Sequence, residues 1–127
     1  MSEDFLLSYY LWLEGHDYPE EKFISDYLYG EREKAVEYIG VLNPNYDEGC
    51  LLIVVAREGD VESLQKLLEK RPKVKCLNAA LCAAALHENR ECAKLLIEKG
   101  ANPEEFRGTT AWDFVSSVVK EMSRNKI

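Results

Sequence analysis

The sequence has few of the features on which catalysis or membrane insertion depends. Its longest apolar runs, Leu51–Ala56 and Ala79–Leu86, are far shorter than the roughly 20 residues of a membrane-spanning helix. It contains no glycine-rich phosphate loop, no Gly-x-Ser-x-Gly elbow and no His-Glu-x-x-His pair. Its two histidines, His16 and His87, lie far apart in the chain. We therefore expect a protein that is not an enzyme, needs no cofactor and does not enter a membrane.

The cysteines also lack the spacing of a metal or redox site, because no two form a Cys-x-x-Cys pair: Cys50, Cys76, Cys82 and Cys92. The trio Cys82, His87 and Cys92 has spacings of five residues, which rotate each side chain away from the last on a helix, and a fourth zinc ligand is missing. A nucleophilic pair of His87 with Cys82 or Cys92 would lack a third, orienting group. The acidic N-terminus is unlike a basic secretory signal, so we expect free thiols in the cytoplasm or nucleus and no metal.

Negative charge and aromatic residues are concentrated in the first half of the chain. Residues 1–64 carry 15 acids and 4 bases, a net charge of −11, whereas residues 65–127 carry 8 acids and 12 bases, a net charge of +4. Ten of the 13 aromatic residues precede Asp47. Because Lys and Arg supply the affinity for phosphate backbones, we expect no direct binding of nucleic acid. A basic protein surface is the more natural partner, unless the acids only solvate helix faces.

Helical periodicity runs through the chain, and no segment shows the alternation of a strand. Apolar residues at helical spacing between Phe5 and Leu13 predict an N-terminal helix that ends near Gly15. An N-terminal aromatic group either seals the end of the molecule or forms a contact patch: Tyr9, Tyr10, Trp12, Tyr18, Tyr27 and Tyr29.

A repeat becomes visible when the chain is compared with itself. Three segments align at a constant offset of 29 residues: 27–39, 56–68 and 85–97. Gly30, Gly59 and Glu88 share one column, and a short helical stretch precedes each segment, at 19–29, about 47–57 and 78–87. Each unit is therefore predicted to be a helix, a tight turn and a second helix. One such pair cannot bury its apolar stripe alone, so the pairs should stack and share a core.

The segment NAALCAAALHENRECAKLLIEKGANPEEFRGTTAWDFV, residues 78–115, resembles the ankyrin repeat. Ala79–Cys82 take the places of that family's Thr-Pro-Leu-His opening, and Ala84-Ala85 take those of the paired alanines that follow. Glu91–Ile97 and the following Glu-Lys-Gly-Ala-Asn resemble its second helix and exit, and Gly108–Trp112 resemble the opening of a further repeat. The resemblance is specific over residues 56–115, weaker over 19–55, and does not cover the first 16 residues.

The resemblance implies an all-α fold, a short ankyrin-like α-solenoid that forms a single domain over residues 1–127. Its parts would be an N-terminal capping helix (1–16), three helix pairs (17–107) and a C-terminal capping repeat (108–127). The family repeats at about 33 residues, whereas two successive units repeat at 29. We therefore expect short loops at 42–47 and 72–78 in place of the family's β-hairpin fingers, with the nearest approach to a full finger at Gly100–Gly108.

The same alignment implies where a partner would bind, since the family's variable positions follow the paired alanines of the first helix. The partner-facing residues are then Leu28, Tyr29, Arg57, Glu58, Leu86, His87, Phe106 and Arg107, with Ser117 and Val118 as further positions. Tyr29, Arg57, Leu86 and His87 would form a row along the groove. Tyr and Arg are enriched in interface hot spots.

The implied function is protein–protein interaction without catalysis. The chain would act as an adaptor or as a stoichiometric inhibitor of a protein partner, such as a viral or host-factor antagonist. The alternative is an acidic decoy that mimics nucleic acid and occupies a basic nucleic-acid-handling protein.

Overall fold

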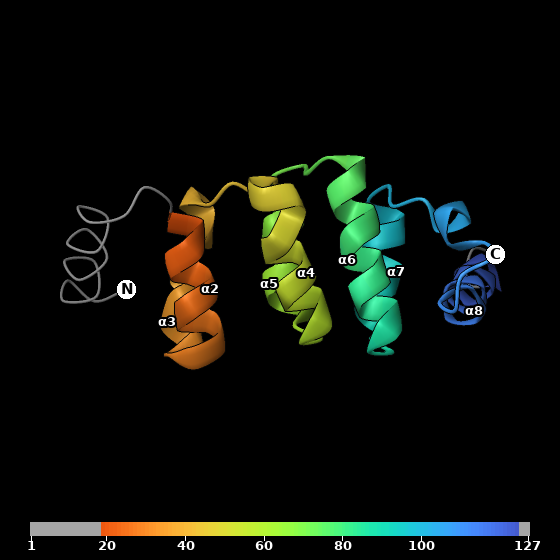
Figure 1. Ribbon diagram of the computed structural model, residues 1–127, viewed down its shortest axis with the longest axis horizontal. Coiled ribbons are helices and arrows are strands. Elements are labelled where there is room, and N and C mark those ends of the chain that lie inside the picture. Colours follow the sequence, from red (N-terminus) through yellow and green to blue (C-terminus); the bar gives the residue numbers. More distant parts are fainter. Residues whose placement is uncertain (1–18, 125–127) are drawn as a thin grey trace. The chain divides into compact units, whose positions relative to one another are not determined.

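The structure, a computed structural model, describes residues 19–124. Its elements are the helices α2 (Pro19–Tyr29), α3 (Arg32–Glu37), α4 (Cys50–Arg57), α5 (Val61–Leu68), α6 (Val74–Leu86), α7 (Arg90–Glu98) and α8 (Trp112–Arg124), with 3₁₀ turns η1 (Ile39–Val41), η2 (Tyr46–Gly49) and η3 (Pro103–Phe106). Residues 19–124 contain no strand, so the all-α prediction is confirmed (Figure 1). Within the same range, no helix has both the length and the apolar content of a membrane-spanning segment. The capping helix predicted at 1–16 lies outside the described residues.

The chain divides into two compact units between Asn43 and Pro44. In the first unit, α2 packs against α3 around an aromatic core. Phe23 stacks on Tyr27 with ring centroids 5.3 Å apart, and Tyr38 meets Phe23 edge-on at 6.1 Å. All three rings are buried, and the hydroxyl of Tyr38 donates a hydrogen bond of 2.8 Å to Asp26. Burial of Tyr27 therefore assigns one member of the N-terminal aromatic group to packing.

The second unit stacks two helix pairs and a final helix. Helix α4 packs on α6, α5 on α7, and α7 on α8, so that α4 and α6 form one layer and α5 and α7 a second (Figure 1). The side chains of its core are fully buried and almost all aliphatic: Leu51, Leu52, Val55, Leu64, Leu67, Leu81, Leu96, Val115 and Val118. Buried alanines of α6, such as Ala80 and Ala84, are small enough to let the helices approach closely. The predicted stack of helix pairs is confirmed in this unit.

The turns of the second unit follow the 29-residue offset. Helices α4 and α6 end at Arg57 and Leu86, and each next helix begins four residues later. In the shared column, Gly59 (φ 72°) and Glu88 (φ 54°) both have the left-handed conformation that ends many helices. Gly30, the third member of the column, has no positive φ; its N–H donates to the carbonyl of Asp26 at 3.1 Å and continues the pattern of α2.

The prediction for residues 72–78 was wrong, because α6 begins at Val74. Lys73 is extended (φ −65°, ψ 151°), and its carbonyl accepts from the N–H groups of Cys76 and Leu77 at 2.9 and 3.1 Å, which starts the helix immediately after it. The helix predicted from about residue 47 starts later, at Cys50, because Gly49 (φ 87°) and the two residues before it have positive φ.

The segment Gly100–Gly108 also differs from its prediction, because it forms the 3₁₀ turn η3 and no β-hairpin finger. Asn102 caps this turn by accepting a hydrogen bond of 3.1 Å from the N–H of Glu104, and Pro103 fixes the first helical φ. The larger scheme of one domain with a capping helix, three helix pairs and a capping repeat stays a prediction.

Candidate partner-binding surface

The predicted partner-facing residues of the second unit lie at the ends of α4 and α6. Arg57 and Glu58 are exposed at the end of α4, and His87 is exposed after α6. Leu86 is 63% exposed, which is high for a large aliphatic side chain on a helix of the stack. In the first unit, Tyr29 ends α2 and is 87% exposed. These side chains are available to another molecule.

Five further positions have different environments, and two of them are corrections. Phe106 is only 7% exposed, because η3 turns its ring inward, and Val118 is fully buried on α8. Neither side chain can meet a partner. Ser117 is half-buried and bonded to a neighbouring helix, as described below. Arg107 is exposed, pairs with Glu104, and lies over the ring of Trp112 at 4.7 Å. In the first unit, Leu28 is half-buried.

A groove of about 640 Å³ separates the end of α6 from the first half of α8. Ala85 and Leu86 line one side, Ala111 and Phe114 the other, and the carboxylates of Glu88 and Asp113 lie among the remaining lining residues. The sequence analysis found Leu86 and His87 but not Glu88, Asp113 or Phe114. Glu88 follows α6 directly, whereas Asp113 and Phe114 lie 25 or more residues further along the chain, so the packing of α8 on α7 brings them to one groove.

The turn that precedes α7 also ties the two helix pairs together. Asn89 donates from its side-chain Nδ2 to the carbonyls of Ala56 and Arg57, at 2.7 and 2.8 Å. The equivalent residue of the previous pair, Asp60, caps its own helix instead, by accepting from the N–H of Ser63 at 3.1 Å. The side chain of Asn89 therefore joins the turn after α6 to the end of α4.

Comparison with known protein families matches one segment of the chain, and that segment coincides with this second helix pair. Residues 76–106 match the family model of the ankyrin repeat. This segment is similar to an ankyrin repeat. It spans most of α6, all of α7 and the turn η3, and it confirms the resemblance over those residues. No curated protein and no solved structure matches the chain. Ankyrin repeats are in general non-enzymatic modules that bind proteins on an extended surface.

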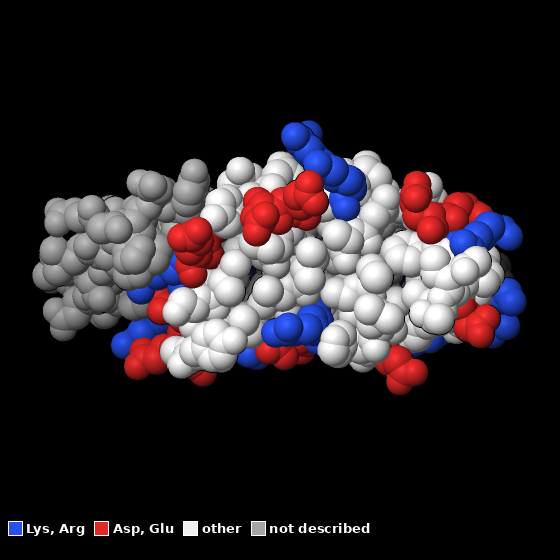
Figure 2. Space-filling view, in the orientation of Figure 1, with Lys and Arg blue, Asp and Glu red and all other residues white. Residues whose placement is uncertain are grey.

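The groove beside the ankyrin repeat is negatively charged at its rim. Glu88 and Asp113 are the charged carboxylates among its lining residues, which include no Lys or Arg. Among residues 19–124, neither carboxylate forms an ion pair. Over α4 and α6, Figure 2 shows a wide area without charged side chains, bordered by charges along the edges.

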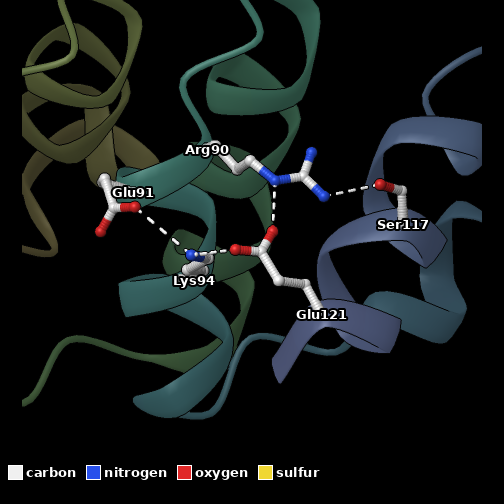
Figure 3. Close-up of polar contacts among 5 residues, drawn as sticks. All are labelled: Arg90, Glu91, Lys94, Ser117 and Glu121. Atoms are coloured by element: carbon white, nitrogen blue, oxygen red, sulfur yellow. Dashed lines mark hydrogen bonds and ion pairs between the residues drawn. The ribbon is translucent and has the colours of Figure 1, made fainter. Parts of the chain in front are cut away.

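An ionic network holds α8 against the last helix of the ankyrin repeat (Figure 3). Arg90 on α7 donates to Glu121 at 2.5 Å and to Ser117 at 2.6 Å, and Lys94 contacts the other oxygen of Glu121 at 2.5 Å. Lys94, and then Arg90, lower the pKa of Glu121, and hydrogen bonding to Glu121 raises the pKa of Lys94. The far wall of the groove is therefore positioned by charges that are already paired.

Cys92 is unsuited to nucleophilic chemistry. Burial first, and then the charges of Asp60 and Glu91, raise the pKa of Cys92 to about 11, so its reactive thiolate is scarce at neutral pH. Residues 19–124 contain no group of three or more His, Cys, Asp or Glu side chains that could hold a metal ion.

Proposed function

We propose that the chain binds a partner protein and does not catalyse a reaction. The binding residues lie mainly at the ends of α2, α4 and α6, each the first helix of its pair. The chain acts as an adaptor or as a stoichiometric inhibitor, of the kind that a viral or host-factor antagonist represents. The contact residues are those that remain exposed or half-exposed from the predicted set: Leu28, Tyr29, Arg57, Glu58, Leu86, His87 and Arg107.

The exposure of Leu86 is the observation that carries this proposal. Leu86 is 63% exposed beside a groove and contributes little to the core. Burial of its side chain against a partner would therefore stabilise the complex. Tyr29, 87% exposed, has the same character in the first unit. Arg57 supports the proposal too, because its side chain is exposed and its guanidinium is 4.0 Å from the carboxylate of Glu58, which is the outer limit of an ion pair.

The experiment is affinity purification of the tagged full-length chain from its native cells, followed by quantitative mass spectrometry. We expect a triple variant to lose the captured partner while keeping its helical circular dichroism: Tyr29→Ala, Arg57→Ala and His87→Ala. A matched control replaces three exposed residues on α5 and α7 and should capture as the parent does: Glu62→Ala, Gln65→Ala and Glu98→Ala. Full capture by the triple variant would refute the assignment of these residues.

The alternative function, an acidic decoy of nucleic acid, is favoured by the net charge of −11 over residues 1–64. Salt distinguishes it from groove binding. The affinity of a decoy should fall steeply between about 50 and 200 mM salt, where long-range charge attraction is screened, whereas apolar contacts change little over that range. A weak salt dependence of the purified complex would exclude the decoy.

A further inference from the structure

The groove between α6 and α8 has a chemistry that selects its occupant. Building on the proposed function, we infer that it takes a basic–apolar peptide segment of the partner protein. In such a segment, one apolar side chain packs between Leu86 and Phe114, and a flanking Lys or Arg pairs with Glu88 or Asp113.

The apolar part of the inference rests on what lines the groove. Leu86 is 63% exposed, Phe114 is half-buried, and the buried alanines Ala85 and Ala111 lie beside them. A volume of about 640 Å³ lies within the range of pockets that bind small molecules, so the groove has room for a side chain of the partner. Such a contact would remove Leu86 from water without moving the helices.

The charged part rests on two carboxylates without a cation. Glu88 and Asp113 make no ion pair with any residue between 19 and 124, and the lining of the groove adds no Lys or Arg. Two unpaired anions beside an apolar wall attract a cationic side chain and oppose an acidic one. Complementarity of charge therefore selects Lys or Arg on the partner.

Nearby cations do not reverse this preference. The guanidinium of Arg90 lies 5.5 Å from the centre of the Phe114 ring, but its charge is paired with Glu121 at 2.5 Å and it also donates to Ser117. Lys120 and Arg124 line an adjoining hollow that Asp113 borders, and neither lines the groove itself. The charged residues that line the groove itself are the two carboxylates Glu88 and Asp113.

The test pans a phage library of random dodecapeptides on the immobilised full-length chain. We expect the enriched peptides to share Leu, Ile, Met or Phe with Lys or Arg within three positions. A fluorescein-labelled copy of an enriched peptide is then measured by fluorescence anisotropy. The double variant Glu88→Gln with Asp113→Asn, which keeps the size of both side chains, should bind it about tenfold more weakly, since the cation of the peptide then has no carboxylate in the groove to pair with.

Two further variants locate the site. Leu86→Asp should remove detectable binding of the peptide, and Glu105→Gln, which neutralises an exposed acid on η3 outside the groove, should leave the affinity within about twofold. Enrichment of acidic or uncharged peptides, no enrichment at all, or an unchanged affinity in the double variant would each overturn the inference.

The outcomes also separate this inference from the proposed function. If the native partner is lost by the triple variant of Tyr29, Arg57 and His87 but still captured by the double variant of Glu88 and Asp113, the partner is not selected by charge in this groove and the proposed function stands. If both variants capture the native partner fully, both ideas fail.

Discussion

The bridge made by Asn89 gives a quantitative test of how the helix pairs are joined. Asn89 stands at the N-cap position of α7, yet its side chain makes no capping hydrogen bond to that helix. Instead its amide donates to the carbonyls of Ala56 and Arg57 at 2.7 and 2.8 Å, at the end of the preceding pair. Two substitutions separate these roles: Asn89→Ala removes the side chain, and Asn89→Asp keeps a good cap but removes the donor.

The expected loss follows from the two hydrogen bonds. Each neutral hydrogen bond contributes a net 0.5–1.5 kcal/mol, so Asn89→Ala should lower the free energy of unfolding by about 2 kcal/mol. The carbonyl of Ala56 keeps a second donor, the N–H of Gly59 at 3.2 Å, which argues against a larger value. Asn89→Asp should cost at least as much, because its carboxylate would face two carbonyl oxygens at hydrogen-bond distance.

Urea-induced unfolding, followed by far-UV circular dichroism, measures the free energy of unfolding of both variants. The slope of that free energy against urea concentration should be the same in each variant as in the parent chain. Asn102→Ala serves as the control, since the Asn102 side chain accepts a local hydrogen bond from Glu104 and its loss should cost about 1 kcal/mol or less. If Asn89→Asp is as stable as the parent chain, Asn89 acts as an ordinary cap and the proposed bridge contributes nothing.

Two further predictions concern packing and pH. Gly49→Ala should lower the free energy of unfolding by more than about 2 kcal/mol, because Gly49 has φ 87° and a Cβ there would lie 2.7 Å from the Cβ of Cys76. Gly108→Ala, with φ 80° and open space around it, should lose only about 1 kcal/mol in the same urea assay, and equal losses would exclude close packing as the cause. The pKa of Glu121 is lowered in the folded state, so its stabilisation is present at neutral pH and is lost as the pH falls through that lowered pKa. Glu121→Gln should therefore have a lower Tm than the parent at pH 7, the difference should shrink as the pH falls below the ordinary pKa of a glutamate, and a constant difference would contradict the ionic network.

The helical fold could be predicted because its signals are local and repeated. The 29-residue offset placed Gly59 and Glu88 in one column, and both adopt the left-handed turn that such a column requires. The start of α6 was misplaced because the short loop expected at 72–78 extends past Val74, where the helix begins. The helical spacing of Cys76, Leu77, Ala80 and Leu81, all buried, extends before residue 78 and could have corrected it.

The binding surface could be predicted only in part. Leu86 and His87 followed from the position of the turn in the repeat, and a turn end of this kind is exposed in any stack. Phe106 was misassigned because the sequence does not reveal that η3 replaces a hairpin, and a hairpin would direct that ring differently. Glu88 and Asp113 come together through tertiary packing, which has no periodic signal along the chain.

The shortened repeat explains why asparagine side chains join the loops of the second unit. With a period of 29 residues instead of about 33, the loops are too short for the paired β-hairpins of full repeats. Their backbone groups still require partners. Asn45 accepts from the N–H of Lys73 at 2.7 Å and joins two loops, whereas Asn78, within α6, accepts from the N–H of Asn102 at 2.7 Å and joins that helix to the loop before η3. Exposed apolar side chains remain at both ends of α6, with Val74 52% exposed at the loop end and Leu86 63% exposed at the other.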